Sequence, residues 1–189
     1  MQKPTYPEAV ISKARQIKLL ICDVDGVLSN GQVIIGNHGE ELKTFNIKDG
    51  FGLKCLQEAG IELAIITGRN SAIVEKRCQE LGIKHYYQGQ SDKQQAFDKL
   101  CQDLSVAPHQ VCHIGDDLPD LPLLQQAGLG VTVADGHWFM RQHADWITEN
   151  PGGFGAVREV CDLILDSQNK LQAIHQGYLN REQNSGVNK

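Results

Sequence analysis

The stretch IKLLICDVDGVL, residues 17–28, constrains the fold most strongly, because it is a short apolar run that ends in two carboxylates and a glycine. Continuous apolarity over so few residues is typical of a strand buried on both faces of a parallel sheet. Asp23 and Asp25 are two residues apart, so they point to the same side of an extended chain. Two carboxylates at the end of a buried strand repel each other, and a cation between them would relieve that repulsion.

The overall composition is that of one globular domain. The chain has 189 residues, of which 41% are hydrophobic, and a net charge of -5. An acidic chain without a basic stripe argues against a nucleic-acid partner. The six cysteines form no CxxC pair and lie mostly in apolar stretches, which favours buried thiols in a reducing cytosol. We find no signal core and no run of membrane-helix length, and therefore expect a cytoplasmic protein without a membrane partner.

Downstream of the first strand, strand-like and helix-like segments alternate. Further strands are predicted at residues 61–66, 83–87, 111–114, 129–133 and 146–147. Helices are predicted at residues 7–16, 50–59, 71–81, 92–104 and 121–127, and a last long helix follows the GGFG segment at residues 152–155. This alternation predicts a doubly wound α/β domain with a mainly parallel sheet. We expect a single domain at residues 1–176 and a flexible polar tail at residues 177–189.

Residues 31–45 interrupt this alternation directly after the acidic motif. Two short strand-like runs flank a Gly-Asn-His-Gly turn, which is typical of a β-hairpin. The segments between the strands are too short for a separate cap domain, which needs at least about 50 residues. The hairpin carries more apolar surface than an isolated two-stranded ribbon can bury. We therefore expect a homo-oligomer, specifically a homotetramer, in which hairpins of neighbouring chains pack together and help to cover each active site. The alternative is a hairpin folded back on its own domain.

Polar side chains follow the predicted strands at the points where the strands end. They are Asp23 and Asp25, Thr67 and Arg69, Lys93, and the group Asp116, Asp117 and Asp120. The carboxyl ends of parallel strands meet at one edge of a doubly wound sheet, where ligands bind. Converging carboxylates suit Mg²⁺ rather than zinc, and a hydroxyl with a lysine suits phosphoryl oxygens. The set predicts phosphoryl transfer through an aspartyl-phosphate.

Four segments together carry a family resemblance. DVDGVL, IITGR, an isolated lysine and GDDLPD, in this order, resemble the four motifs of the haloacid dehalogenase superfamily over residues 18–147. The resemblance implies that Asp23 is the nucleophile. It implies that Asp25 protonates the leaving group and then activates water. It also implies that Thr67 and Lys93 stabilise the transferring phosphoryl group.

The same resemblance implies a metal site. Asp23, the backbone carbonyl of Asp25 and Asp116 would hold Mg²⁺ as the cofactor. Asp117 and Asp120 would orient metal-bound water and the catalytic lysine.

Longer segments narrow the resemblance to phosphatases that act on phosphorylated eight-carbon keto-sugar acids in lipopolysaccharide synthesis. DVDGVLSNG, GNHGEELKTFNIKDGFG and GGFGAVREVCDLIL are among them. By this resemblance, the substrate-binding residues besides Asp25 and Lys93 are Asn46, Lys48, Asp49, Gly50, Arg69 and Arg77. One departure is Phe154, which stands where a basic residue is expected in the GGxGA element.

The residues themselves favour a substrate with a second anion. Arg69, Lys48 and Arg77 are cations beyond those that the phosphate needs, and on an acidic protein they suggest a carboxylate ligand. An alternative for Arg77 is a surface ion pair with Glu80.

Two other functions remain open at this point. A nine-carbon keto-sugar acid phosphate is the alternative substrate within the enzyme class. A receiver-type signalling domain also uses an acidic cluster, a threonine and a lysine on a doubly wound sheet. It has no need of a second aspartate two residues after the first, so Asp25 favours an enzyme.

Overall fold

The computed structural model describes residues 4–184. Its centre is a six-stranded parallel sheet in the order β5-β4-β1-β6-β7-β8. The strands are β1 (Leu19–Cys22), β4 (Glu62–Ile66), β5 (His85–Tyr87), β6 (Val111–Gly115), β7 (Leu129–Thr132) and β8 (Trp146–Ile147). From β1 the chain builds first one side of the sheet and then the other, which confirms the predicted doubly wound fold.

The central strand β1 is buried over its whole length, as its continuous apolar sequence predicts. Alternate residues enter two separate cores. Leu20 and Cys22 pack on one face of the sheet, and Leu19 and Ile21 pack on the other. Such a strand needs cover on both faces.

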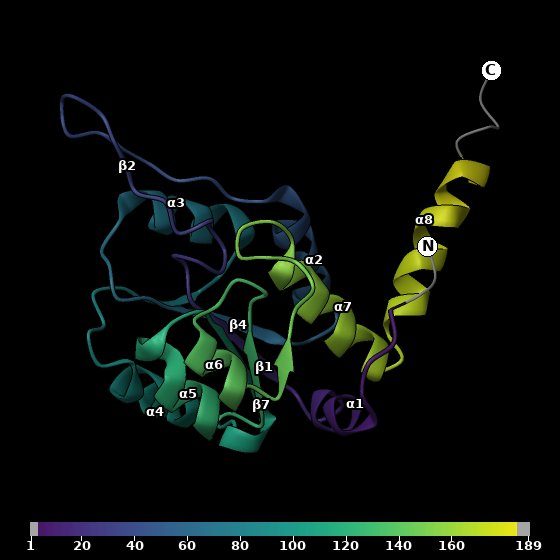
Figure 1. Ribbon diagram of the computed structural model, residues 1–189. Helices are drawn as coiled ribbons and strands as arrows, with labels where there is room; N and C mark the ends of the chain where they lie inside the picture. The colour runs from purple at the N-terminus through teal and green to yellow at the C-terminus, as the bar shows by residue number, and fades with distance from the viewer. Residues whose placement is uncertain (1–3, 185–189) are drawn as a thin grey trace.

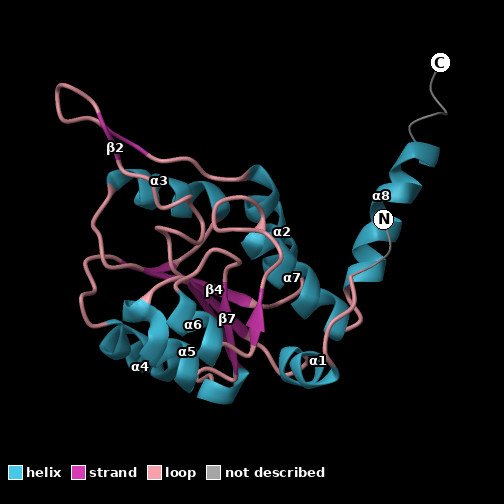
Figure 2. Ribbon diagram, viewed as in Figure 1, coloured by secondary structure: helices cyan, strands magenta, loops and turns pink. Residues whose placement is uncertain are grey.

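Helices provide that cover (Figure 1; Figure 2). They are α1 (Glu8–Ala14), α2 (Ile47–Glu58), α3 (Ala72–Leu81), α4 (Lys93–Leu104), α5 (Leu121–Gln126), α6 (Trp138–His143), α7 (Ala156–Ser167) and α8 (Leu171–Asn184). Side chains of α1, α2, α3 and α7 fill one core, whereas α4 and α5 fill the other. The sheet edge at which the strands end, called the catalytic edge below, is therefore held by a fully packed scaffold.

The predicted hairpin is confirmed. Strands β2 (Ile34–Ile35) and β3 (Glu41–Leu42) pair antiparallel, with Ile34 opposite Leu42 and Ile35 opposite Glu41. The hairpin projects beyond α3 from the body of the domain (Figure 1). Its apolar side chains are exposed, with Ile35 at 68% and Leu42 at 57% of full exposure. The described residues contain no separate cap domain, so the hairpin is the main insertion above the sheet.

Three helical details differ from the sequence-based expectation. The sequence favours Asp49 as the cap of a helix that begins near residue 50, but α2 begins at Ile47. Asn46 caps it instead, because the Asn46 side chain accepts the backbone N–H of Lys48. The short helix α6 was not expected. The last helical segment is broken at Asn169, which adopts a positive φ of 58° and separates α7 from α8.

Helix α8 crosses the proposed domain boundary at residue 176. The division into a domain and a flexible tail therefore stays a prediction, and residues 185–189 lie outside the described part. All six cysteines are free, and all but Cys101 are buried, as expected. Within residues 4–184, no helix has the length and apolarity that a membrane crossing requires.

Candidate active site

The residues predicted to carry the chemistry meet at the catalytic edge. A cavity of about 190 Å³ lies there. It is lined by Asp23, Asp25, Thr67, Gly68, Arg69, Lys93, Asp116, Asp117, Pro119 and Asp120. These residues come from the ends of β1, β4 and β6 and from the start of α4. The strand-exit argument expected these residues to lie close together, and they line one cavity.

Lys93 is the centre of a buried charge network. It is the first residue of α4, whose N-cap Asp92 accepts the backbone N–H of Gln94. Its Nζ donates to Asp23 Oδ1 at 2.8 Å and to Asp120 Oδ1 at 2.7 Å. Burial alone would lower the pKa of Lys93, but the two carboxylates outweigh it and the pKa is raised. The lysine therefore stays charged beside the predicted nucleophile.

His113 extends this network, although the sequence analysis did not single it out. It is fully buried on β6, and its Nε2 lies 3.1 Å from Asp120 Oδ1. Burial would raise the pKa of Asp120, but His113 and Lys93 outweigh it and the pKa is lowered. The only sequence signal was one polar residue inside an otherwise apolar strand. Asp120 is thus fixed by two partners, and it in turn fixes Lys93.

Asp23, Asp116 and Asp120 form the acidic cluster. One oxygen of each lies within 4.8 Å of the others. Burial, followed by neighbouring carboxylates, raises the pKa of Asp23 to about 6 and that of Asp116 to about 7. Gly26, at φ 90°, leaves room for Asp116, because a Cβ there would overlap Asp116 Oδ2. Crowded carboxylate oxygens with raised pKa values are what a hard divalent cation stabilises.

The predicted ligands fit this cluster in part. The side chains of Asp23 and Asp116 are brought together, as expected. The Asp25 side chain is outside the cluster, which agrees with a ligand role through its backbone carbonyl only. Asp120, predicted to orient Lys93, accepts a hydrogen bond from it and is also a member of the cluster.

Asp25 has partners that the sequence analysis missed. Its Oδ1 forms an ion pair with Lys43 Nζ and accepts a hydrogen bond from Ser29 Oγ at 3.3 Å. Lys43 directly follows β3, so a side chain of the hairpin reaches into the catalytic edge. A signal existed in the sequence, because Glu41 and Lys43 alternate with Leu42 and so face one side of a strand.

The two predicted substrate arginines have different surroundings. Arg69 lines the catalytic cavity and donates to Glu41 Oε1 at 2.9 Å. Arg77 pairs with Glu80 at 3.3 Å, as the alternative interpretation expected, and its guanidinium also lies 5.6 Å from the Phe45 ring centroid. The backbone of Gly50 lies against the guanidinium of Arg77, since a Cβ there would crowd Nη2. Gly50 therefore makes room for Arg77.

The remaining predicted contacts lie at the start of α2. Asn46 caps this helix, and Lys48 is exposed. Asp49 is buried and accepts the backbone N–H of Arg158 at 2.7 Å, which fixes the start of α7. Burial raises the pKa of Asp49 to about 6. Asn46 and Asp49 thus have structural roles, and their contact with substrate stays a prediction.

The GGFG loop packs directly on the acidic motif. Gly153 N donates to Val27 O at 2.8 Å, and a Cβ at Gly152 would overlap the carbonyl oxygen of Gly26. Only glycine allows this approach, so the loop supports the turn that carries Asp25. Phe154 is 59% exposed.

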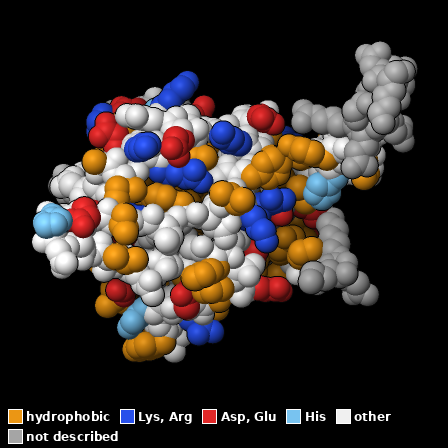
Figure 3. Space-filling model, turned by 90° about the horizontal axis from the view of Figure 1, so that it is seen from above, with side chains coloured by type: hydrophobic (Ala, Val, Ile, Leu, Met, Phe, Trp, Pro, Cys, Tyr) orange, Lys and Arg blue, Asp and Glu red, His pale blue; other side chains and the backbone are white. Residues whose placement is uncertain are grey.

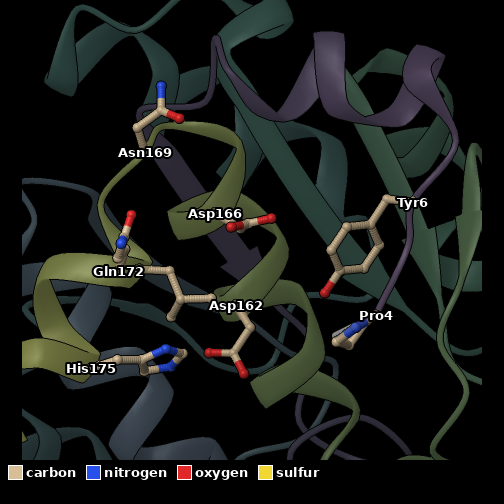
Figure 4. A pocket seen from close by; sticks show the side chains of 8 residues that line it. Pro4, Tyr6, Asp162, Asp166, Asn169, Gln172 and His175 are labelled. Carbon is tan, nitrogen blue, oxygen red and sulfur yellow. The ribbon is translucent and has the colours of Figure 1, made fainter. Parts of the chain in front are cut away.

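A larger cavity, of about 540 Å³, lies away from these residues (Figure 4). Tyr6 from the N-terminal segment and Asp162 and Asp166 from α7 line it, with His175 from α8. Burial, and then the two aspartates, raise the pKa of Tyr6 to about 12, so its hydroxyl stays neutral. None of the predicted site residues lines this cavity, and we place the chemistry at the smaller, acidic one.

Two carboxylates, a threonine and a buried lysine lie together at one edge of a doubly wound sheet. This arrangement is typical of phosphoryl-transfer hydrolases of the haloacid dehalogenase type. Comparison with known proteins agrees, since residues 52–128 match the haloacid dehalogenase-like hydrolase family.

Individual relatives are more specific. The 3-deoxy-D-manno-octulosonate 8-phosphate phosphatase KdsC of Escherichia coli is 55% identical over 162 residues, which are 86% of each chain. A crystal structure of this phosphatase from Yersinia pestis is 53% identical, with a TM-score of 0.87 over 87% of this chain and 89% of that one. The chain belongs to the family of 3-deoxy-D-manno-octulosonate 8-phosphate phosphatases, within the haloacid dehalogenase-like hydrolases.

One solved structure carries ligands. It is the Moraxella catarrhalis 3-deoxy-D-manno-octulosonate 8-phosphate phosphatase in complex with a magnesium ion, a phosphate ion and a KDO molecule. It is 47% identical to this chain, with a TM-score of 0.90 over 92% of this chain and 99% of that one.

Proposed function

We propose that the protein hydrolyses 3-deoxy-D-manno-octulosonate 8-phosphate to 3-deoxy-D-manno-octulosonate and phosphate, with Mg²⁺ as cofactor, in lipopolysaccharide biosynthesis. The observation that carries the proposal is the Asp23 carboxylate at the end of β1, which belongs to the acidic cluster and accepts a hydrogen bond from the buried Lys93. The high sequence identity with relatives that are named for this activity supports the same substrate. The protein is then a phosphoric monoester hydrolase.

Asp23 and Asp25 divide the chemistry. An Asp23 carboxylate oxygen attacks phosphorus, and the bond between phosphorus and the sugar oxygen breaks. Asp25 gives its proton to that oxygen, so the sugar leaves as a neutral alcohol. A water molecule then attacks the phosphorus of the aspartyl-phosphate, Asp25 takes the water proton, and Asp23 is released as a carboxylate. Lys93 and Thr67 donate hydrogen bonds to the phosphoryl oxygens during both steps.

The magnesium site follows from the same residues. Asp23, Asp116 and the backbone carbonyl of Asp25 would hold the ion, and the crowding of the carboxylates is consistent with it. When bound, Mg²⁺ neutralises charge on the carboxylates and the phosphate and so lets two anions meet.

Substrate selection rests on cations beyond the phosphate site. Arg69 lines the catalytic cavity and would supply positive charge for the sugar carboxylate. Arg77 lines a separate pocket together with Gly50 of α2, and we propose that Arg77 and Lys48 add to the positive charge that the substrate meets. Asn46, Asp49 and Gly50 complete the proposed contact region at the start of α2. A nine-carbon keto-sugar acid phosphate is the alternative substrate, because these contacts do not discriminate between sugars of eight and nine carbons.

We further propose a cytoplasmic homotetramer. Seen from above, hydrophobic side chains are interspersed with Lys and Arg on this face of the molecule (Figure 3). Val33, Ile34, Ile35 and Leu42 of the hairpin are among the exposed apolar residues. Packing of hairpins from neighbouring chains would cover them and the free strand edges. Light scattering coupled to size exclusion should then report about four times the chain mass.

The activity is tested with a phosphate-release screen in the presence of Mg²⁺. The substrates are 3-deoxy-D-manno-octulosonate 8-phosphate, a nine-carbon keto-sugar acid 9-phosphate and glucose 6-phosphate, which lacks the carboxylate. The eight-carbon substrate should give the highest kcat/KM. A higher kcat/KM for the nine-carbon acid would mean that this acid, and not the eight-carbon one, is the substrate. A single stoichiometric phosphorylation of the protein without turnover would favour the receiver-type function.

A further inference from the structure

Two charged side chains of the hairpin face the catalytic edge. Glu41 and Lys43 flank Leu42, so in the extended chain they lie on one side and Leu42 on the other. The exposures agree: the Lys43 side chain is 1% exposed, whereas Leu42 is 57% exposed. A lysine is almost never fully buried without a partner. The burial of the Lys43 side chain therefore indicates a charged or polar partner.

The partner of Lys43 is the proposed general acid. Lys43 Nζ pairs with Asp25 Oδ1 and lies 3.6 Å from Glu41 Oε1. Ser29 Oγ donates to the same Asp25 oxygen at 3.3 Å. Because both donors engage Oδ1, the carboxylate is oriented with Oδ2 as the oxygen that remains for proton transfer. Glu41 also accepts from Arg69, so the hairpin fixes two residues of the site at once.

We propose that Lys43 is a positioning residue for Asp25. By holding Oδ1, it aims the carboxylate at the oxygen of the leaving group. General acid catalysis contributes about 10²- to 10⁴-fold, and a displacement of about 1 Å can cost about 10²-fold. The inference rests on the proposed function only in requiring that Asp25 protonates the leaving group. It does not depend on which sugar phosphate is the substrate.

The leaving group separates positioning from a merely structural role. Phenyl phosphate has a poor leaving group that needs a proton, whereas p-nitrophenyl phosphate releases a phenolate that is stable without one. kcat/KM reports the steps up to departure of the leaving group. Lys43→Met should lower kcat/KM for phenyl phosphate by about 30-fold or more and for p-nitrophenyl phosphate by less than about 3-fold, following the magnitudes of general acid catalysis. Lys43→Arg, which keeps a cationic donor, should recover part of the loss.

Lys99→Met is the matched control. It removes a lysine of α4 that pairs with Asp103 on the surface, and both substrates should be used as by the parent protein. Equal losses on both substrates in Lys43→Met, or no loss on either, would overturn the proposal. Melting temperature and light scattering check that the variant keeps its fold and assembly. If Lys43→Met does not fold, Lys43→Gln takes its place in the same comparison.

The two proposals fail separately. Aryl phosphates carry no sugar acid, so the leaving-group comparison stays valid even if the parent protein does not hydrolyse 3-deoxy-D-manno-octulosonate 8-phosphate. That result would overturn the proposed substrate without affecting the proposed role of Lys43.

Discussion

The catalytic edge and the hairpin are built in opposite ways. At the edge, Asp23, Lys93 and Asp120 are buried and hold one another through hydrogen bonds of 2.7–2.8 Å. In the hairpin, strands of two residues each expose Ile34, Ile35 and Leu42. In the proposed function, the edge carries the chemistry that every phosphate ester requires, and the hairpin contributes to substrate selection and assembly. The ion pair between Lys43 and Asp25 joins the two regions.

The largest effect should come from the edge. Asp23→Asn removes the anionic nucleophile with little change in shape. Activity should fall by at least about 10⁴-fold on every phosphate ester, in line with the removal of other catalytic nucleophiles. Steady-state phosphate release measures it, with deamidation excluded by mass spectrometry. Substantial turnover of any substrate would falsify the assignment of Asp23.

A smaller and more selective effect is expected from Arg69, which lies between the two regions. Arg69→Ala should lower kcat/KM for the sugar-acid phosphate by about 10- to 100-fold, the range for a hydrogen bond to a charged group. The loss on p-nitrophenyl phosphate should be slight, because that ester has no second anion. Arg141→Ala, on the exposed face of α6, is the matched control. Equal losses on both esters would mean that Arg69 serves the phosphate or the fold.

The hairpin itself should affect assembly more than chemistry. Ile35→Glu places a charge on its most exposed apolar position, and the tetramer should dissociate into smaller species. Hydrolysis of p-nitrophenyl phosphate should remain within about 10-fold, since the edge is intact. Light scattering and the aryl phosphate assay measure the two effects. Gln102→Glu adds the same charge to α4 and should change neither; an intact tetramer in Ile35→Glu would contradict the hairpin interface.

The smallest effect concerns stability and pH. The pKa values of Asp23 and Asp116 are raised to about 6 and about 7, so the folded metal-free protein binds more protons than the unfolded chain between about pH 4 and 7. Its stability should therefore fall as pH rises through this window. A difference of only one between the folded-state and unfolded-state pKa of a carboxyl group corresponds to about 1.4 kcal/mol of unfolding free energy. The melting temperature should therefore drop by at least roughly 3 °C across this window.

Two conditions should flatten that slope. Mg²⁺ binds the ionised carboxylates, and Asp116→Asn removes the group with the higher pKa of the two. The comparison is made by thermal unfolding across pH 4–7 of the parent protein in chelator, the parent protein in excess Mg²⁺, and Asp116→Asn in chelator. An unchanged slope in both conditions would show that other groups govern the pH dependence.

Local sequence patterns predicted the edge better than the hairpin. Asp23, Thr67 and Asp116 follow apolar strands, and parallel topology alone brings such exits together. Lys43 was missed because its contact with Asp25 depends on where the tertiary fold places the residue that follows β3. His113 was missed because its partner, Asp120, becomes a neighbour only when the turn after β6 closes. The prediction of an eight-carbon sugar substrate came from the resemblance over the whole chain and not from any local sequence pattern.

Helix ends show the same limit on a smaller scale. The sequence analysis expected Asp49 to cap a helix that begins near residue 50, although Asn46 is an equally good cap. In the structure Asn46 caps α2, and Asp49 instead accepts from Arg158 on α7, a contact across 109 positions of sequence. Such a tertiary contact leaves no periodic signal.

The most direct test of the central claim is to trap the phosphorylated side chain. The protein is mixed with 3-deoxy-D-manno-octulosonate 8-phosphate and Mg²⁺, quenched in acid within a turnover and reduced with borohydride, which converts an aspartyl-phosphate to homoserine. Peptide mass spectrometry should find homoserine at position 23 only when substrate and Mg²⁺ are both present. Homoserine at Asp25 or Asp116, or rapid turnover with no modified aspartate, would contradict phosphoryl transfer through Asp23.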